Sequence, residues 1–154
     1  MAVMPKMDVL DEAIIDSPPM VVYKAILNEY AGVTHWWMPI LESKLRGDMP
    51  VDREGAIFDV TLNPKSRINI KVSDKVTKIV EAKSIETEIA GDFVGTGKYT
   101  FEPTDGKTKV QYRFNARTNR LLFSLVSPFV NIGKKHSDTM QKGFKACNSY
   151  LSKK

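Results

Sequence analysis

Four side chains of this 154-residue chain have the chemistry of acid–base or ligand-orienting groups. His136 lies on the apolar side of a C-terminal helical pattern, and an imidazole can transfer a proton near physiological pH. Tyr99 and Tyr112 alternate in step with apolar neighbours, so their hydroxyls would point inward and either orient a ligand or cap the core. His35 precedes a tryptophan pair. Their spacing defines no catalytic triad, so all four are candidates only, and a hydrogen-bonded core histidine is the alternative for His136.

The rest of the sequence argues against several familiar kinds of site. The only cysteine, Cys147, permits no internal disulfide, and one cysteine with two histidines argues against a zinc site, so we expect no metal and no cofactor. Residues 91–99, GDFVGTGKY, have the wrong glycine spacing for a phosphate-binding loop, and Tyr99 stands where that loop needs Ser or Thr. No serine lies in a nucleophile elbow, and no acidic pair is expected on an inner strand face.

Alternation of apolar and polar residues predicts the strands that would position these side chains. The predicted strands, about seven in number, cover residues 8–16, 41–46, 56–63, 68–73, 85–89, 93–102 and 109–117. Turn signals separate them, among them Asn63-Pro64, Gly91-Asp92 and Asp105-Gly106. Such a pattern is typical of an antiparallel sheet with an apolar inner face and a polar outer face.

Three helices complete the predicted fold. Ser17 and Pro18 suit the start of a helix over residues 19–28 with Ser17 as the N-cap, and a short second helix over 33–38 would end before Pro39. Ser127-Pro128 would begin a long helix that reaches residue 152, about 37 Å at 1.5 Å per residue. Its apolar stripe recurs every three or four residues through Phe129, Ile132, His136, Met140, Phe144, Cys147 and Leu151. The sheet must wrap around this helix to bury the stripe.

The order of these elements, together with several short phrases, resembles the START-like (SRPBCC) superfamily, which includes polyketide cyclase/dehydrase-like and lipid-transfer proteins. The phrases are Ile15-Asp16-Ser17-Pro18-Pro19, Trp36-Trp37, Gly55-Ala56-Ile57-Phe58, Gly97-Lys98-Tyr99-Thr100-Phe101 and Gly106-Lys107-Thr108-Lys109-Val110. The resemblance covers residues 8–152 and implies one α+β domain of the helix-grip fold over residues 1–154, with residues 1–7 as a flexible tail. It also implies a hydrophobic cavity between the sheet and the last helix. It implies no single activity, because a fold does not fix function.

Three local features bear on such a cavity. Gly95 and Gly97 share the inward parity of Tyr99, so they either leave room for a ligand or let the strand bend. Gly143 lies beside the helical stripe, where a glycine costs about 1 kcal/mol relative to alanine, and it provides either ligand space or close contact with the sheet. The tryptophan pair would line the pocket mouth or plug the end of the core. The candidate ligand-binding residues are Trp36, Trp37, Phe58, Val60, Ile70, Ile85, Phe93, Gly97, Tyr99, Tyr112, Phe114, His136, Met140, Gly143 and Phe144.

Three functions are compatible with these features. The first is binding or transport of a small hydrophobic molecule, such as a lipid, an isoprenoid or a polyketide-like compound, in the internal cavity. The second is a polyketide cyclase or dehydratase that uses the same cavity, with His136, Tyr99, Tyr112 and His35 as catalytic candidates, because a shaped cavity supplies much of such a rate. The third is a protein-interaction module that binds a chaperone or the ribosome. The sequence does not decide whether the protein is an enzyme, and it leaves the protein partner and the oligomeric state open.

Charge and hydropathy give weaker indications about partners. The net charge of +5 is concentrated in residues 107–154, which favours either anionic ligands or a solvated lysine-rich helix face, and no pattern indicates nucleic-acid binding. Leu121, Leu122, Phe123 and Leu125, with basic flanks, could contact an anionic membrane weakly, although a buried helix is the alternative. No signal sequence or membrane span is expected, and the single cysteine favours a reducing, cytoplasmic location.

Overall fold

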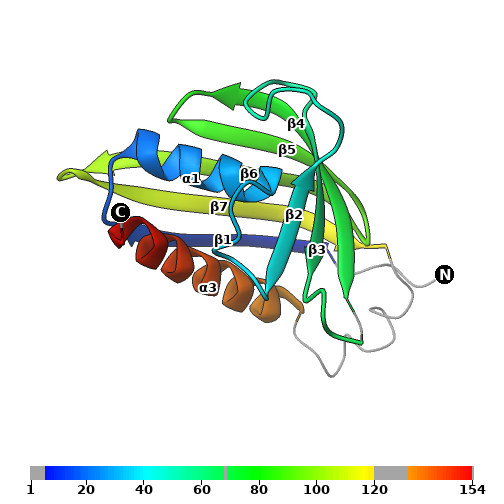
Figure 1. The fold of residues 1–154 in the computed structure, drawn as a ribbon. Coiled ribbons are helices and arrows are strands. Elements are labelled where there is room, and N and C mark those ends of the chain that lie inside the picture. Colours follow the sequence, from blue (N-terminus) through cyan, green and yellow to red (C-terminus); the bar gives the residue numbers. More distant parts are fainter. Residues whose placement is uncertain (1–5, 68, 120–131, 154) are drawn as a thin grey trace.

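The computed structural model describes residues 6–67, 69–119 and 132–153. In it the chain forms a strongly curved antiparallel sheet that wraps around two helices (Figure 1). The strands are β1 Lys6–Ile15, β2 Leu41–Leu45, β3 Ile57–Leu62, β4 Ile70–Val80, β5 Ser84–Gly91, β6 Phe93–Thr104 and β7 Lys107–Thr118. The helices are α1 Pro19–Ala31 and α3 Ile132–Ser152. The seven strands follow the order β1-β7-β6-β5-β4-β3-β2, so the predicted helix-grip architecture is confirmed.

Local sequence explains the longest hairpin and a bend in the sheet. Asp105 and Gly106 both have positive φ, which a two-residue hairpin turn requires, and they join β6 to β7 in the register Thr104 opposite Lys107. In β4 the register with β5 shifts between Val76 and Lys78, which marks a bulge. A bulge increases the local twist, so it helps the sheet curl around the helices.

The two helices cover the concave face of the sheet. In Figure 1, α3 runs alongside β1 and α1 crosses the sheet next to β2. Two hydrogen bonds tie α3 to the first strand and its end: Gln141 Nε2 donates to the Glu12 carbonyl over 3.1 Å, and the Asp16 amide donates to Asn148 Oδ1 over 2.9 Å. The predicted helix start at Ser127-Pro128 and the candidate membrane segment at Leu121, Leu122, Phe123 and Leu125 lie outside the described residues.

Two expected details near α1 differ from the structure. The prediction of Ser17 as the N-cap is wrong, because the cap is Pro18 and the Ser17 hydroxyl donates instead to the Asp16 carbonyl. The segment expected as a second short helix forms turns over residues 36–40. The physical reason is Glu29, whose carboxylate accepts hydrogen bonds from the Trp36 and Trp37 amides and fixes their direction.

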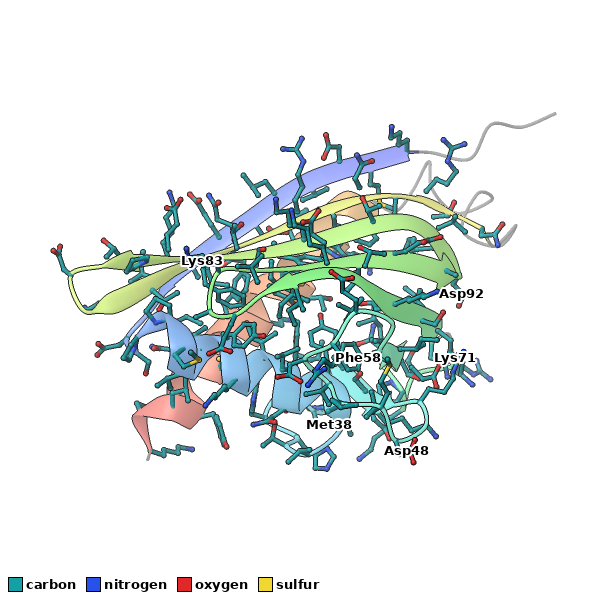
Figure 2. The ribbon with its side chains drawn as sticks, turned by 90° about the horizontal axis from the view of Figure 1, so that it is seen from above. Met38, Asp48, Phe58, Lys71, Lys83 and Asp92 are labelled. Carbon is teal, nitrogen blue, oxygen red and sulfur yellow. The ribbon has the colours of Figure 1, made fainter. Side chains whose placement is uncertain are left out.

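The outer face of the sheet carries the polar side chains that the alternation predicts. Arg113 forms a bidentate pair with Asp8, and Arg46 forms one with Asp59, but exposed pairs of this kind contribute little to stability because water screens them. Figure 2 shows Lys71 close to Asp92 at one end of the sheet and Lys83 toward the other end. Among the described residues, no helix is both long enough and apolar enough to span a bilayer.

Candidate functional site

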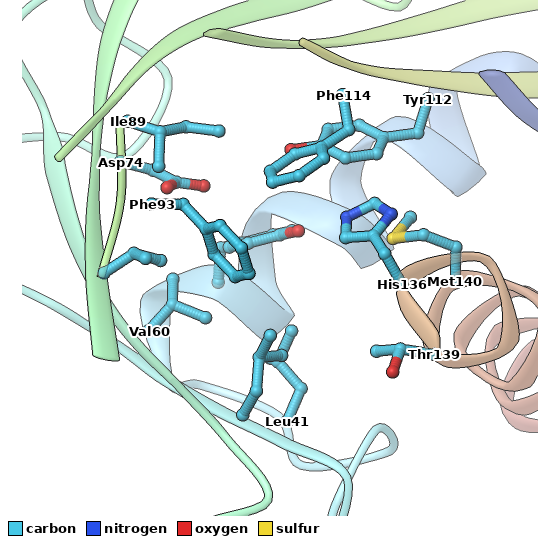
Figure 3. Close-up of a pocket in the computed structure, with 13 residues that line it drawn as sticks. Leu41, Val60, Asp74, Ile89, Phe93, Tyr112, Phe114, His136, Thr139 and Met140 are labelled. Atoms are coloured by element: carbon cyan, nitrogen blue, oxygen red, sulfur yellow. The ribbon is translucent and has the colours of Figure 1, made fainter. Parts of the chain in front are cut away.

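A cavity lies between the inner face of the sheet and α3 (Figure 3). Its empty volume is about 430 Å³ including its opening to solvent, of which about 40 Å³ can hold the centre of a water molecule. It is lined by Tyr30, Leu41, Val60, Leu62, Val72, Asp74, Ile89, Phe93, Tyr112, Phe114, His136, Thr139 and Met140. The walls are therefore mostly aliphatic and aromatic, with a few polar groups, which is the usual composition of a small-molecule site.

A second, smaller space adjoins this cavity under α1. It has an empty volume of about 260 Å³ and is lined by Ile26, Leu27, Tyr30, Phe58, Asp74, Ile85, Thr87 and Tyr99. Tyr30 and Asp74 line both spaces, so the two meet at these side chains. A change of rotamer at Tyr30 would therefore alter the boundary between them.

Three tyrosine hydroxyls lie around this boundary. The Tyr30 and Tyr99 hydroxyls share a buried hydrogen bond of 2.7 Å. The rings of Tyr99 and Tyr112 lie with their centroids 4.4 Å apart. Burial raises the pKa of all three tyrosines well above the usual value, and the nearby Asp74 charge acts in the same direction. These phenols are therefore neutral hydrogen-bonding groups at physiological pH.

Asp74 is the carboxyl group of the cavity wall. It follows Val72 on the inner face of β4, its side chain is only 6% exposed, and its carboxyl oxygens turn toward the cavity in Figure 3. Neither oxygen has a hydrogen bond with any described residue, and Oδ1 is fully buried. Burial raises the pKa of Asp74 to about 7, so the group changes protonation state close to neutral pH.

His136 faces the cavity from α3, on the side opposite Asp74 (Figure 3). Its ring stacks on Phe114 with a centroid distance of 4.0 Å, and its Nδ1 lies 3.9 Å from Asp11 Oδ2. That separation is too long for a direct hydrogen bond, and both atoms lack a partner among the described residues. Burial lowers the pKa of His136 to about 4, so the imidazole is neutral at physiological pH.

The candidate ligand-binding residues fall into two groups. Those that line one of the two spaces are Phe58, Val60, Ile85, Phe93, Tyr99, Tyr112, Phe114, His136 and Met140. Those that line neither are Trp36, Trp37, Ile70, Gly97, Gly143 and Phe144. Of the catalytic candidates, His35 is exposed and lines neither space, whereas Tyr99, Tyr112 and His136 surround them.

Three glycines make room for neighbouring parts of the protein and not for a ligand. A Cβ at Gly97 would collide with the Tyr112 ring and hydroxyl, so the glycine makes room for that ring. A Cβ at Gly143 would collide with the Trp37 indole, which is buried between α1 and α3. Gly95 allows close approach of β7 at Ala116. Trp37 therefore plugs the core, while the half-buried Trp36 stacks on it with a centroid distance of 5.6 Å.

Sequence reasoning missed several residues at these spaces. They are Ile26, Leu27, Tyr30, Leu41, Leu62, Val72, Asp74, Thr87, Ile89 and Thr139. Asp11 on β1 and Asp74 on β4 are both buried on inner strand faces, and sequence reasoning placed neither of them there. Their inward parity is readable: Asp11 alternates in step with Ile15, and Asp74 alternates in step with Val72 and Val76.

Cys147 offers no further chemistry to this site. The side chain is fully buried in α3, and burial raises the pKa of its thiol to about 12, so it stays protonated and inert. Among the described residues, no three side chains suited to metal binding converge.

Comparison with known proteins agrees with the helix-grip architecture. The family model for polyketide cyclase/dehydrase and lipid transport proteins matches residues 7–147. The chain belongs to this family. The matched range includes β2 to β7, all of β1 except its first residue, and most of α3, so the family assignment applies to the curved sheet and its C-terminal helix. No curated protein matches the sequence significantly.

Solved structures with this fold are similar over nearly the full length but distant in sequence. Ara h 8.0201 is 18% identical with a TM-score of 0.69, covering 97% of this chain and 100% of its own. A norcoclaurine synthase point mutant from Thalictrum flavum, solved with a transition state analogue, is 11% identical with a TM-score of 0.63, covering 99% and 98%. A protein from Mycobacterium smegmatis is 14% identical with a TM-score of 0.67, covering 94% and 90%. At these identities the likeness concerns the fold alone.

Proposed function

We propose that the protein binds a small hydrophobic ligand in the cavity between the sheet and α3. The observation that carries this proposal is the cavity itself, which lies between the sheet and α3 and has mostly apolar walls with a few polar groups. Membership of a family described by polyketide cyclisation and lipid transport supports the same class of ligand. Lipids, isoprenoids and polyketide-like compounds all fit this description.

The residues proposed to contact the apolar part of the ligand come from both sides of the cavity. Val60, Phe93 and Phe114 provide the sheet wall, and Met140 provides the helix wall. Aromatic rings and a flexible thioether adapt to irregular apolar shapes, so this surface suits a range of related ligands better than one rigid compound.

Filling the cavity tests the proposal. Titration with N-phenyl-1-naphthylamine should give saturable fluorescence enhancement with the wild-type protein. Val60→Phe places a ring inside the cavity, so we expect probe affinity to fall about tenfold or more, as a lost 1.4 kcal/mol would cause. Val94→Phe makes the same exchange on the exposed face of β6, where the side chain is 43% exposed, and should leave the affinity unchanged.

Two outcomes would contradict the proposal. One is the absence of saturable binding to the wild-type protein by the probe and by a panel of lipids and aromatic polyketide mimics. The other is an equal loss of affinity in the Val60 and Val94 variants. Val72→Phe, at the half-buried edge of the same cavity, provides a second filled variant if Val60→Phe does not fold.

A cyclase or dehydratase that uses the same cavity is the second candidate, favoured by one observation. Asp74 titrates near neutral pH beside the cavity, and general acid–base catalysis is most effective when the pKa of the group is close to the working pH. Tyr112 and His136 would then orient the substrate. Turnover of a polyketide-like substrate that survives Asp74→Asn, Tyr112→Phe and His136→Gln together would rule out this mechanism.

A further inference from the structure

Asp74 is a buried carboxyl group that has no hydrogen-bond partner among the described residues. Its carboxyl group makes no hydrogen bond with any described residue, although it is 6% exposed. The other titratable side chains that line the two adjoining spaces are His136 and three tyrosines, and none of them carries a positive charge at neutral pH. Asp74 therefore has neither a hydrogen-bond donor nor a counter-charge within the described protein.

This arrangement brings no visible structural benefit. A buried polar group without a partner destabilises the folded state, and a buried unpaired charge does so more strongly. Val72 and Val76 precede and follow Asp74 on the same face of β4, so an apolar side chain would suit the strand. The cavity beside Asp74 has room for a water molecule, which could hydrogen-bond to the carboxyl group while the cavity is empty.

We propose that Asp74 recognises the polar end of the ligand by accepting a hydrogen bond from its hydroxyl or amine group. The assignment rests on the proposed function and narrows it to apolar molecules that carry a hydrogen-bond donor. The donor would sit where the two spaces meet at Tyr30 and Asp74, and the apolar part would extend toward Phe93 and Met140. The neutral tyrosine hydroxyls provide further hydrogen-bonding groups near the same point.

Three compounds of nearly equal shape test the assignment: ethylbenzene, benzyl alcohol and benzylamine. The three compounds differ in how strongly water solvates them. The informative quantity is therefore the ratio of dissociation constants between two compounds, and the change of that ratio between two proteins. For each protein we compare the dissociation constant of benzyl alcohol or benzylamine with that of ethylbenzene. We expect the preference for the alcohol or the amine over ethylbenzene to be about tenfold or more greater in the wild-type protein than in Asp74→Leu, because hydrogen bonds to a charged acceptor are worth this much. A larger change for benzylamine indicates a cationic ligand, and a larger change for benzyl alcohol indicates a neutral one.

Glu42→Leu is the matched control, since it exchanges an acid for leucine at an exposed position of β2 that lines neither space, and it should leave the ratios within about twofold. Asp74→Leu should melt no lower than wild type, because it removes an unpartnered group and no hydrogen bond. If that variant does not fold, Asp74→Asn keeps the volume but removes the charge, and the preference for benzylamine should fall.

The outcomes separate this assignment from the proposed function. If none of the three compounds, nor the fluorescent probe, binds the wild-type protein, both proposals fail. If all three bind with the same ratios in wild type and in the Asp74 variants, the cavity stands and the assignment of Asp74 is overturned. Equal changes in the Glu42 and Asp74 variants would overturn it as well.

Discussion

Two buried carboxyl groups, Glu29 and Asp74, lie in regions of very different construction. Glu29 is 2% exposed and accepts three hydrogen bonds: Thr34 Oγ1 at 2.8 Å and the Trp36 amide at 3.0 Å on one oxygen, and the Trp37 amide at 2.8 Å on the other. Asp74 is 6% exposed and accepts none from the described residues. The first region is filled by side chains, whereas the second borders a cavity.

The difference separates a structural acid from a candidate recognition acid. Glu29 holds the turn that directs Trp37 onto Gly143, so its hydrogen bonds connect α1 to α3 through one indole ring. Asp74 connects nothing within the described protein and faces empty space. The two carboxyl groups are similarly buried, so burial does not distinguish them. The presence or absence of hydrogen-bond partners does.

The largest expected effect is the loss of the Glu29 hydrogen bonds. Glu29→Leu leaves the Trp37 amide buried without an acceptor and removes the bonds from Thr34 and the Trp36 amide as well, so we expect the free energy of unfolding to fall by roughly 3 kcal/mol. Urea denaturation followed by tryptophan fluorescence measures it. Glu42→Leu, at an exposed position on β2, should change stability by no more than about 0.5 kcal/mol. If Glu29→Leu lost less than about 1 kcal/mol of unfolding free energy, the Glu29 hydrogen bonds would not have the structural role described above.

The next substitution, Gly143→Ala, tests how closely side chains fill the Glu29 region. Gly143→Ala gains about 1 kcal/mol of helix propensity, but its methyl group collides with the Trp37 indole. Because overpacking costs about 1–3 kcal/mol, we expect a net destabilisation of roughly 1 kcal/mol together with a changed tryptophan emission spectrum. Lys142→Ala, one residue earlier on the exposed side of α3, is the control and should change neither. A more stable Gly143→Ala protein with an unchanged spectrum would mean that space remains beside Trp37.

The sequence predicts the framework of both regions better than their interiors. Seven strands and the long helix follow from periodicity, because each strand has one buried and one exposed face. The roles of Gly97 and Gly143 do not follow, because they depend on where the rings of Tyr112 and Trp37 turn, and those rings come from other elements. A glycine beside a ligand and a glycine beside an aromatic ring look the same in one sequence.

Asp74 was missed for a different reason. The predicted strand ends at residue 73, whereas β4 continues to Val80 through a bulge. Extending the alternation by three residues would have placed Asp74 between Val72 and Val76 on the inner face. Its lack of a partner, however, requires the positions of all the elements that surround it.

The last effect concerns pH and compares Asp74 with His136 across the cavity. The pKa of Asp74 is raised from 3.8 to about 7, so the folded carboxyl keeps a proton that the unfolded one has lost, and this contribution destabilises the fold as pH rises from about 4 to 7. The pKa of His136 is lowered from 6.5 to about 4, so its contribution stabilises the fold as pH rises through about 4 to 6.5. In the wild-type protein the two contributions offset one another.

Removing either group should therefore reveal the other. Relative to wild type between about pH 4.5 and 6, the unfolding free energy of Asp74→Asn should rise with pH and that of His136→Gln should fall, each by up to about 1.4 kcal/mol per pH unit. Urea denaturation at three pH values measures both slopes, and the shared contribution of the surface carboxylates cancels in the difference from wild type. Slopes parallel to wild type in both variants would mean that water reaches the cavity well enough to solvate Asp74 and His136, and the contrast with the closely filled Glu29 region would then be one of shape alone.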